Sequence, residues 1–439
     1  MANLRLPLEG VRIASIEVVY AGPFGTQMLA NLGAELIMVE SIHVRPVASR
    51  PGNVPDSWLE IPGRLRHYHD KDVTTPGLQN RDGMFNSKHF NKLSCTIDLT
   101  QPEGKDVFKR LIERCDVFFE NNSATTIERL GLTYDVLSSW NPKLIYVNAP
   151  ALATEGPYKY FIGYGTNMEA LTGHAWLRGY PDEDHPMHLY FDVYQMDASG
   201  GMAAAAAILM GLWFRARTGK GQWIDSGSAQ TVIPQFAEAI MDYTMNKRVR
   251  RTLGNRDLWA APCGAYPSRG GEDRWICITC YNDEQWEGFC RTIGNPEWTK
   301  KEIFATHPSR YEHQDELDEH IKEWTSRHDD YEAMFILQKE GVPSAPVLNE
   351  RDTLRDPQVA ARGFYERVDG TKHGTGVHMF PGMMWKYSKT PMSIRIPPCG
   401  LGEHNKYVFK EVIGMSDEEI ARLEKDETIG GTAYKEYAL

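Results

Sequence analysis

Short apolar runs rich in β-branched residues alternate with helical patterns in the first part of the chain. Val11–Val19 is such a run, and Pro23 just after it suits the first turn of a helix. Phe24–Leu32 has the apolar spacing of a helix, and Glu35–Glu40 returns to an apolar strand pattern. This order is that of a βαβ unit, so the sequence predicts an α/β fold with a doubly wound, Rossmann-like parallel sheet.

The same alternation resumes after a long polar segment. Residues 41–84 are rich in Pro, Gly, Arg and His and predict a long loop. A strand at Cys95–Leu99, a helix at Pro102–Arg114 and a strand at Asp116–Glu120 follow it. No Gly-x-Gly-x-x-Gly segment comes after the first strand, so the fingerprint of a nicotinamide or flavin site is missing.

The pattern changes past residue 230. Tyr266–Tyr281 has the pattern of two antiparallel strands around a turn, and charged helical segments fill Asp283–Lys339. We therefore expect a large Rossmann-like domain at residues 1–230, a smaller α+β domain at 231–340 and a C-terminal segment at 341–439.

One acid lies directly before the longest apolar helix of the chain. Asp197 precedes the run Met202–Phe214, where an N-cap carboxylate is stabilised by free backbone N–H groups and the helix dipole. Gly200 and Gly201 remove side chains beside it, so a ligand could approach closely. An ionised, accessible carboxylate can attack an activated acyl group, although a purely structural cap would also explain Asp197. Asp192 is a competing carboxylate.

Polar residues follow the strand that ends at Glu120. Asn121 comes directly after it, and Arg129 and Leu130 come shortly afterwards. Ligands of open α/β sheets bind at the carboxyl ends of the strands, where an amide and a guanidinium suit a phosphorylated cofactor. A solvated helix residue is the alternative interpretation of Arg129.

The charge balance narrows the set of partners. Lys and Arg total 48 against 59 Asp and Glu, a net charge of −11. This balance disfavours general binding to nucleic acid or to an anionic membrane. The N-terminus lacks a basic segment followed by an apolar core, so we expect no secretory signal and a cytoplasmic location.

The seven cysteines are scattered and odd in number, which favours reduced thiols. Cys277 and Cys280 have Cys-x-x-Cys spacing, but they lie in an apolar strand-like run. A zinc site would need a second pair of ligands, and no second Cys-x-x-Cys exists. We therefore expect no metal site.

An ordered set of short motifs resembles the class III family of CoA-transferases, the formyl-CoA transferase and carnitine CoA-transferase group that is related to α-methylacyl-CoA racemase. The nucleophilic aspartate of that family falls on Asp197. The other matching segments run through nearly the whole chain: Ala21-Gly22-Pro23, Leu32-Gly33-Ala34, Val39-Glu40, Thr218-Gly219-Lys220-Gly221-Gln222, Gly341–Pro346, Asp356–Val359, Ala361–Gly363 and Leu401–Asn405.

The resemblance implies transfer of CoA between two carboxylic acids, with an acyl-CoA donor, a free carboxylate acceptor and no permanently bound cofactor. Asp197 would pass through a mixed anhydride and an aspartyl-CoA thioester. The family's binding positions fall on two groups of residues. The CoA-binding group is Lys92, Asn121, Arg129 and Leu130, and the substrate-pocket group is Tyr20, Tyr164, Gly200 and Gly201.

The resemblance also implies an assembly. We expect a C-terminal segment that returns to the large domain, and an interlocked homodimer or a heteromer with a related subunit. Several family residues differ in this chain. Tyr20 stands where some transferases have an active-site glutamine, Ser41 and Leu93 stand at two arginine positions, and the glycine-rich loop is absent.

Two alternatives to a self-sufficient transferase stay open. A 2-methylacyl-CoA racemase needs two acid/base groups and carries Gly-His-Asp where this chain has Gly163-Tyr164-Gly165, and tyrosine is a poor base near neutral pH. A catalytically silent CoA-binding subunit of a hetero-oligomer is the other alternative, which the missing arginines favour and Asp197 disfavours.

Overall fold

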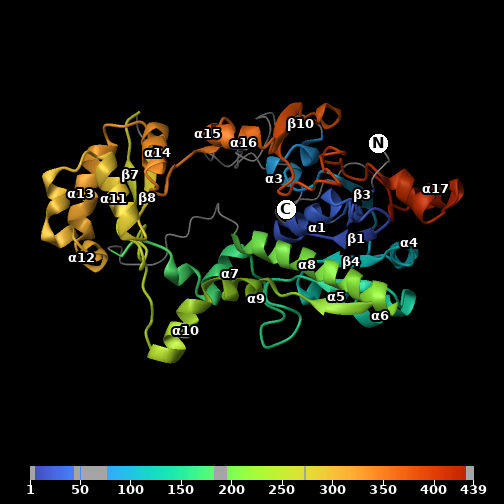
Figure 1. The fold of residues 1–439 in the computed structure, drawn as a ribbon. Coiled ribbons are helices and arrows are strands. Elements are labelled where there is room, and N and C mark those ends of the chain that lie inside the picture. The colour runs from blue at the N-terminus through green and yellow to red at the C-terminus, as the bar shows by residue number, and fades with distance from the viewer. Residues whose placement is uncertain (1–4, 44–49, 51–76, 182–194, 271–272, 432–439) are drawn as a thin grey trace, which may run out of the picture. The chain divides into compact units, whose positions relative to one another are not determined.

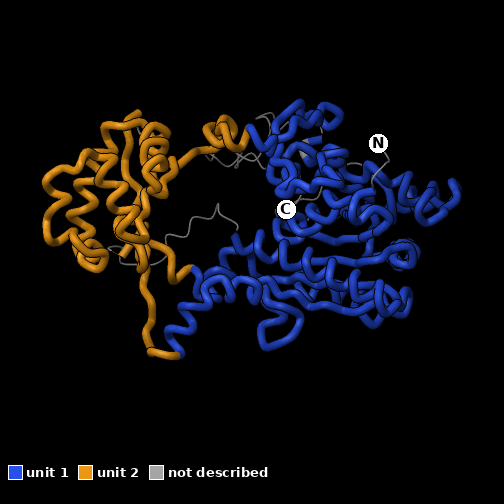
Figure 2. Tube along the Cα trace, viewed as in Figure 1, with its two compact units in different colours: residues 1–174, 190–244, 361–439 blue, residues 175–189, 245–360 orange. Residues whose placement is uncertain are grey.

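A computed structural model describes residues 5–43, 50, 77–181, 195–270 and 273–431. Asp192 and most of the predicted loop at 41–84 lie outside these residues. The chain forms two compact units: residues 1–174, 190–244 and 361–439 make the larger one, and residues 175–189 and 245–360 the smaller (Figure 2). The domain boundaries expected at residues 230 and 340 stay a prediction.

A six-stranded parallel sheet forms the centre of the larger unit, in the order β3-β2-β1-β4-β5-β6 (Figure 1). The strand order reverses between β1 and β4, which is the point where open α/β sheets bind ligands. The doubly wound sheet expected from the sequence is confirmed. The strands are β1 (Arg12–Ile16), β2 (Glu35–Glu40), β3 (Lys92–Thr96), β4 (Val117–Glu120), β5 (Ile145–Asn148) and β6 (Gln222–Asp225).

Helices cover both faces of this sheet because successive strand residues point to opposite faces. Phe118 packs into one hydrophobic cluster with α4 (Pro102–Ile112), α5 (Ala124–Leu130) and α6 (Tyr134–Trp140). Phe119 packs into the other cluster with α1 (Ala21–Asn31) and α8 (Gln195–Thr218). The remaining helices of the larger unit are α3 (Gly83–Asn86), α7 (Gly165–Thr172), α9 (Ser228–Val232), α10 (Ala237–Asn246), the last residue of α16 (Pro357–Ala361), and α17 (Asp417–Lys425).

Most of the C-terminal segment predicted at 341–439 belongs to the larger unit, as expected: residues 361–439 return to it, and residues 341–360 belong to the smaller unit. The returning part forms the antiparallel pair β10 (Tyr365–Asp369) and β11 (Val377–Pro381), and Leu423 of α17 joins the same cluster as Phe118.

The smaller unit is an α+β arrangement with a core of its own. Its antiparallel sheet has the order β7-β8-β9, formed by Cys263–Pro267, Trp275–Thr279 and Ser344–Pro346. Its helices are α11 (Asp283–Thr292), α12 (His307–Glu312), α13 (Gln314–Thr325), α14 (Asp330–Lys339) and α15 (Glu350–Thr353).

The long apolar helix α8 packs closely on α1. A Cβ added at Gly25 would lie 2.4 Å from the carbonyl oxygen of Gly201, and one added at Gly201 would lie 2.4 Å from that of Ala21. The length and composition of α8 would suit a membrane span. Ala204 and Ile208 of this helix are buried in the core beside the sheet, which is the environment of a core helix.

Candidate active site

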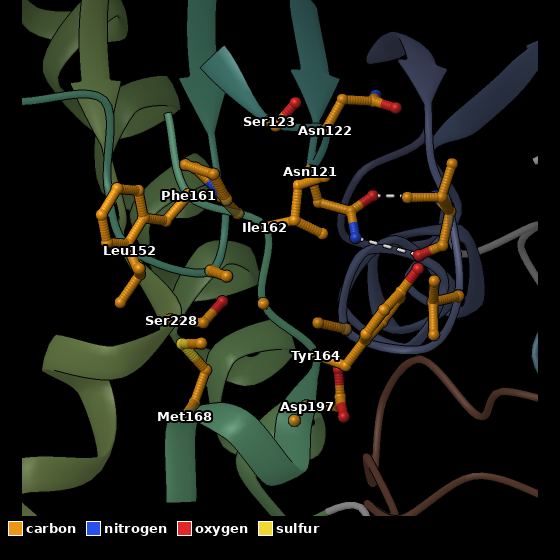
Figure 3. A pocket seen from close by; sticks show the side chains of 18 of the residues that line it. Asn121, Asn122, Ser123, Leu152, Phe161, Ile162, Tyr164, Met168, Asp197 and Ser228 are labelled. Atoms are coloured by element: carbon orange, nitrogen blue, oxygen red, sulfur yellow. Dashed lines mark hydrogen bonds between the residues drawn. The ribbon is translucent and has the colours of Figure 1, made fainter. Parts of the chain in front are cut away.

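Two cavities adjoin at the carboxyl ends of β1 and β4, each of about 290 Å³. We call them the Asp197 cavity, shown in Figure 3, and the Arg129 cavity. Val18, Asn122 and Thr126 line both of them, so the two cavities share a wall. The sequence-predicted binding residues Asn121, Arg129 and Leu130 gather here as well.

Asp197 lies in the first turn of α8, because the helix begins at Gln195. The expectation that Asp197 directly precedes the helix is therefore wrong by three residues, although its carboxylate still lies at the positive end of the helix dipole. A Cβ at Gly165 would lie 2.1 Å from Asp197 Oδ2, so only glycine leaves room for the carboxylate at that position. Figure 3 shows Asp197 beside Tyr164 in the wall of the cavity.

The carboxylate of Asp197 is partly withdrawn from water. Burial raises the pKa of Asp197 to about 6, and the negative charge of Glu169 acts in the same direction. A hydrogen bond from the backbone N–H of Ala21 and the positive charge of Lys88 oppose this rise. A desolvated carboxylate near neutral pH is mostly ionised and less well hydrated, which favours nucleophilic attack.

The Ala21 N–H group lies at the start of α1, directly after the loop that follows β1. Asn121 accepts a hydrogen bond from the backbone N–H of Val18 (2.8 Å) and donates one to its carbonyl oxygen (2.9 Å), as dashed lines show in Figure 3. The next residue, Val19, has φ +61°, a conformation that β-branched residues rarely adopt. A Cβ at Gly22 would lie 2.4 Å from Asn121 Oδ1, which explains the glycine of the Ala-Gly-Pro motif.

Lys92 is not among the described residues that line the two cavities, and its side chain is fully buried. Its Nζ donates to Glu17 (2.7 Å), to Thr26 Oγ1 (2.8 Å) and to the carbonyl oxygen of Pro23 (2.9 Å). These bonds use all three donors of the ammonium group. Burial would raise the pKa of Glu17, but the charges and hydrogen bonds of Lys92 and His89 together outweigh it, and the pKa is lowered to about 2. In this structure Lys92 supports the β1–α1 junction, and its direct contact with CoA stays a prediction.

The surroundings of Gly200 and Gly201 also differ from those expected, because other parts of the chain fill the space predicted for a ligand. A Cβ at Gly200 would lie 2.8 Å from Ser228 Oγ, and Gly201 faces the backbone of α1. Both glycines are buried, and neither is among the described residues that line the two cavities. Their role in the structure is close helix packing.

Of the two predicted pocket tyrosines, Tyr164 lines the Asp197 cavity and is 45% exposed. Tyr20 lies at the N-cap of α1, outside the described walls of the two cavities. The Nζ atom of Lys88 lies 4.2 Å from the centroid of the Tyr20 ring.

Sequence reasoning missed Lys88 and Glu169, the two charges that act on Asp197. Lys88 is buried, donates to the carbonyl oxygen of Met84 (2.7 Å) and to Ser87 Oγ (3.1 Å), and has its pKa lowered by burial to about 8. Glu169 of α7 is buried one helical turn after Gly165. No local motif marks either residue, because each acts only through its neighbour in the fold.

The Arg129 cavity combines apolar residues with one guanidinium, and the carboxyl-bearing residues Glu17, Glu40 and Asp98 also line it. Its apolar residues include Ile16, Met38, Phe85 and Leu130, and it lies at the carboxyl ends of β1 and β2. Such a cavity suits a planar ring with a phosphate nearby. Among the described residues, no group of three or more His, Cys, Asp or Glu side chains is placed to hold a metal ion.

Comparisons with known proteins agree with this geometry. Residues 8–405 match the family CoA-transferase family III. The chain is 30% identical over 424 residues to succinyl-CoA–D-citramalate CoA-transferase of Chloroflexus aurantiacus, covering 96% of this chain and 98% of that protein. It is also 30% identical over 425 residues to the succinyl-CoA–L-malate CoA-transferase beta subunit of the same organism, covering 97% and 98%. A CAIB/BAIF family protein from Brucella suis superposes with a TM-score of 0.77 at 27% identity, covering 93% of this chain and 100% of that one.

Proposed function

The chain belongs to CoA-transferase family III, and we propose that Asp197 is the nucleophile with which it moves CoA from an acyl-CoA donor to a free carboxylic acid. One observation carries this proposal: a partly desolvated carboxylate lies in a cavity that adjoins a second, apolar cavity with a guanidinium. Together, the two cavities offer space for the reactive thioester and for the nucleoside of CoA.

The binding mode follows from the order of the two cavities. The adenine ring would occupy the Arg129 cavity, and the pantetheine arm would pass the shared wall of Val18, Asn122 and Thr126. The thioester would then reach Asp197. Apolar walls favour the ring and the arm, while the phosphates need cations.

The first half of the reaction breaks the donor thioester. A carboxylate oxygen of Asp197 attacks the thioester carbonyl, the C–S bond breaks, and the CoA thiolate leaves a mixed anhydride. The thiolate then attacks the aspartyl carbonyl and expels the donor carboxylate, which gives an aspartyl-CoA thioester. The second half reverses these steps. The acceptor carboxylate expels the thiolate to form a new anhydride, and the thiolate attacks the acceptor carbonyl and frees Asp197.

The site offers two aids to these steps. The backbone N–H of Ala21 already donates to the Asp197 carboxylate and can stabilise negative charge on the carbonyl oxygen during attack. Partial burial of Asp197 limits hydrolysis of the acyl intermediates by water.

The names of the relatives suggest which acids to test first. Succinyl-CoA is the donor in both relatives, and D-citramalate and L-malate are the acceptors. We therefore place succinyl-CoA first among donors and dicarboxylic acids first among acceptors, followed by larger organic acids.

A hetero-oligomer is the second candidate, because one relative is the beta subunit of an enzyme. In that case this chain would bind CoA and need a related subunit for turnover. An interlocked homodimer would need no such partner.

The test is chemical trapping. Purified protein is incubated with succinyl-CoA and an acyl-CoA panel, treated with hydroxylamine, digested and mapped by mass spectrometry. A hydroxamate on Asp197, absent from Asp197→Asn, supports the covalent mechanism, and transfer to a panel of free acids then identifies the acceptor. Measurable CoA binding with neither an adduct nor transfer would contradict the self-sufficient enzyme and favour the partner-dependent one.

A further inference from the structure

Lys159 is the one cation among the described residues that line the Asp197 cavity. It lies between β5 and α7, three residues before Ile162 in the same wall. No sequence motif marked this lysine. Its place at the site nevertheless puts a positive charge beside the path proposed for CoA.

Three contacts define where the Lys159 ammonium lies. Nζ is 3.7 Å from Glu128 Oε1 and 4.5 Å from the centroid of the Tyr160 ring. The Tyr160 hydroxyl lies 3.5 Å from the same Glu128 oxygen. The side chain is about one-third exposed, so the ammonium can still meet a ligand from the solvent side.

Helix α5 links this lysine to the second cavity. Glu128 contacts Lys159, while the next residue, Arg129, lines the Arg129 cavity. The shared wall residue Thr126 lies on the same helix. Arg129 of α5 therefore lines one cavity, and Lys159, which contacts the same helix through Glu128, lines the other.

CoA carries two separate groups of negative charge, a diphosphate and a 3′-phosphate. Each needs cationic partners in a protein whose net charge is −11. Among the described residues that line the two cavities, Lys159 and Arg129 are the lysine and the arginine that can supply this charge.

We propose that Lys159 binds the diphosphate of CoA, while Arg129, which the family resemblance already places at the CoA site, faces the 3′-phosphate. The assignment rests on the proposed function and follows the order of groups along the ligand. The 3′-phosphate is attached to the nucleoside in the Arg129 cavity, and the diphosphate comes next on the way to Asp197. Binding replaces the Glu128 contact of Lys159 with a contact to phosphate oxygens.

The test compares three ligands by titration calorimetry: CoA, 3′-dephospho-CoA and pantetheine. Lys159→Met should weaken CoA and 3′-dephospho-CoA by the same factor, about tenfold, and leave pantetheine unchanged. Arg129→Met should weaken the binding of CoA but not the binding of 3′-dephospho-CoA. Lys159→Arg should restore most of the affinity, and Glu128→Gln should tighten CoA because it removes the competing carboxylate.

Lys143→Met is the matched control, because this exposed lysine lies at the amino end of β5, opposite the cavities. It removes the same charge and should leave all three affinities unchanged. The inference is wrong if Lys159→Met binds CoA with the affinity of the wild type. It is also wrong if the affinity for pantetheine falls as much as the affinity for CoA. If the wild type binds no CoA at all, the proposed function fails with it.

Discussion

The side-chain amide of Asn121 and the backbone of Val18 exchange two hydrogen bonds, of 2.8 and 2.9 Å, beside the adjoining ends of β1 and β4. These bonds hold the loop in which Val19 has a positive φ. Ala21 follows this loop, and its backbone N–H donates to Asp197. The amide of Asn121, which is expected to contact CoA, therefore also fixes the loop that leads to Ala21, the donor to the proposed nucleophile Asp197.

Asn121→Ala should lower both stability and turnover. Loss of the two bonds leaves the Val18 backbone groups without these partners, at a cost of about 1–3 kcal/mol in the free energy of unfolding. Turnover should fall because the Ala21 N–H is no longer fixed. Urea unfolding and kcat measure the two effects.

Asn141→Ala is the control, because Asn141 donates to the carbonyl oxygens of Ile112 and Cys115 away from the cavities. It should lower stability and leave kcat unchanged. Equal kcat in Asn121→Ala and the wild type would contradict a positioning role for Asn121.

Asp197→Asn should abolish transfer and stabilise the protein. Loss of the nucleophile should cost a factor of about 10³ or more in kcat. The pKa of Asp197 is raised to about 6 in the folded protein, so the folded state favours its protonated form. Stability therefore falls as the pH rises from the pKa of Asp197 in the unfolded chain, near 4, through its folded pKa of about 6. The neutral amide of Asn does not ionise, so the variant lacks this penalty at pH 7. Thermal unfolding at pH 5 and pH 8 checks the sign: a gain in melting temperature should be larger at pH 8.

Activity should fall as the pH drops below about 6, because protonated Asp197 is not a nucleophile. The groups that shift this midpoint are Glu169, Lys88 and the Ala21 N–H. Lys88→Met removes a charge that lowers the pKa of Asp197, so the acid midpoint of kcat/KM should move to higher pH. Glu169→Gln should move it to lower pH.

Lys88→Arg keeps the charge and should leave the acid midpoint near that of the wild type. Identical pH profiles for Lys88→Met and the wild type would show that Lys88 does not act on Asp197.

Lys92→Met should unfold the protein more readily because it leaves the buried carboxylate of Glu17 without its cation. Removing one partner of a buried ion pair costs about 3–5 kcal/mol. The pKa of Glu17 is lowered to about 2, so the pair stabilises the fold above the unfolded pKa of 4.5, and this contribution is lost as the pH falls toward 2.

The double variant Glu17→Gln/Lys92→Met removes both charges and should recover part of the lost stability. A fully stable Lys92→Met protein with weakened CoA affinity would instead support Lys92 as a direct CoA ligand.

The sequence by itself determined the α/β alternation, the family and the position of Asp197. These features are encoded locally, in the spacing of apolar residues and in short motifs such as Ala21-Gly22-Pro23. Even so, the start of α8 was misplaced by three residues, because helix ends depend on contacts that periodicity does not report.

Only the tertiary structure decided what surrounds Asp197. Asn121 and Val18 are separated by 103 positions, and Lys92 and Glu17 by 75. Gly200 and Gly201 were predicted to leave room for a ligand, yet Gly200 packs against Ser228 and Gly201 packs against the backbone of α1. The charges of Lys88 and Glu169 reach Asp197 from separate segments. Such roles arise from distances through space, and neither periodicity nor motif spacing contains those distances.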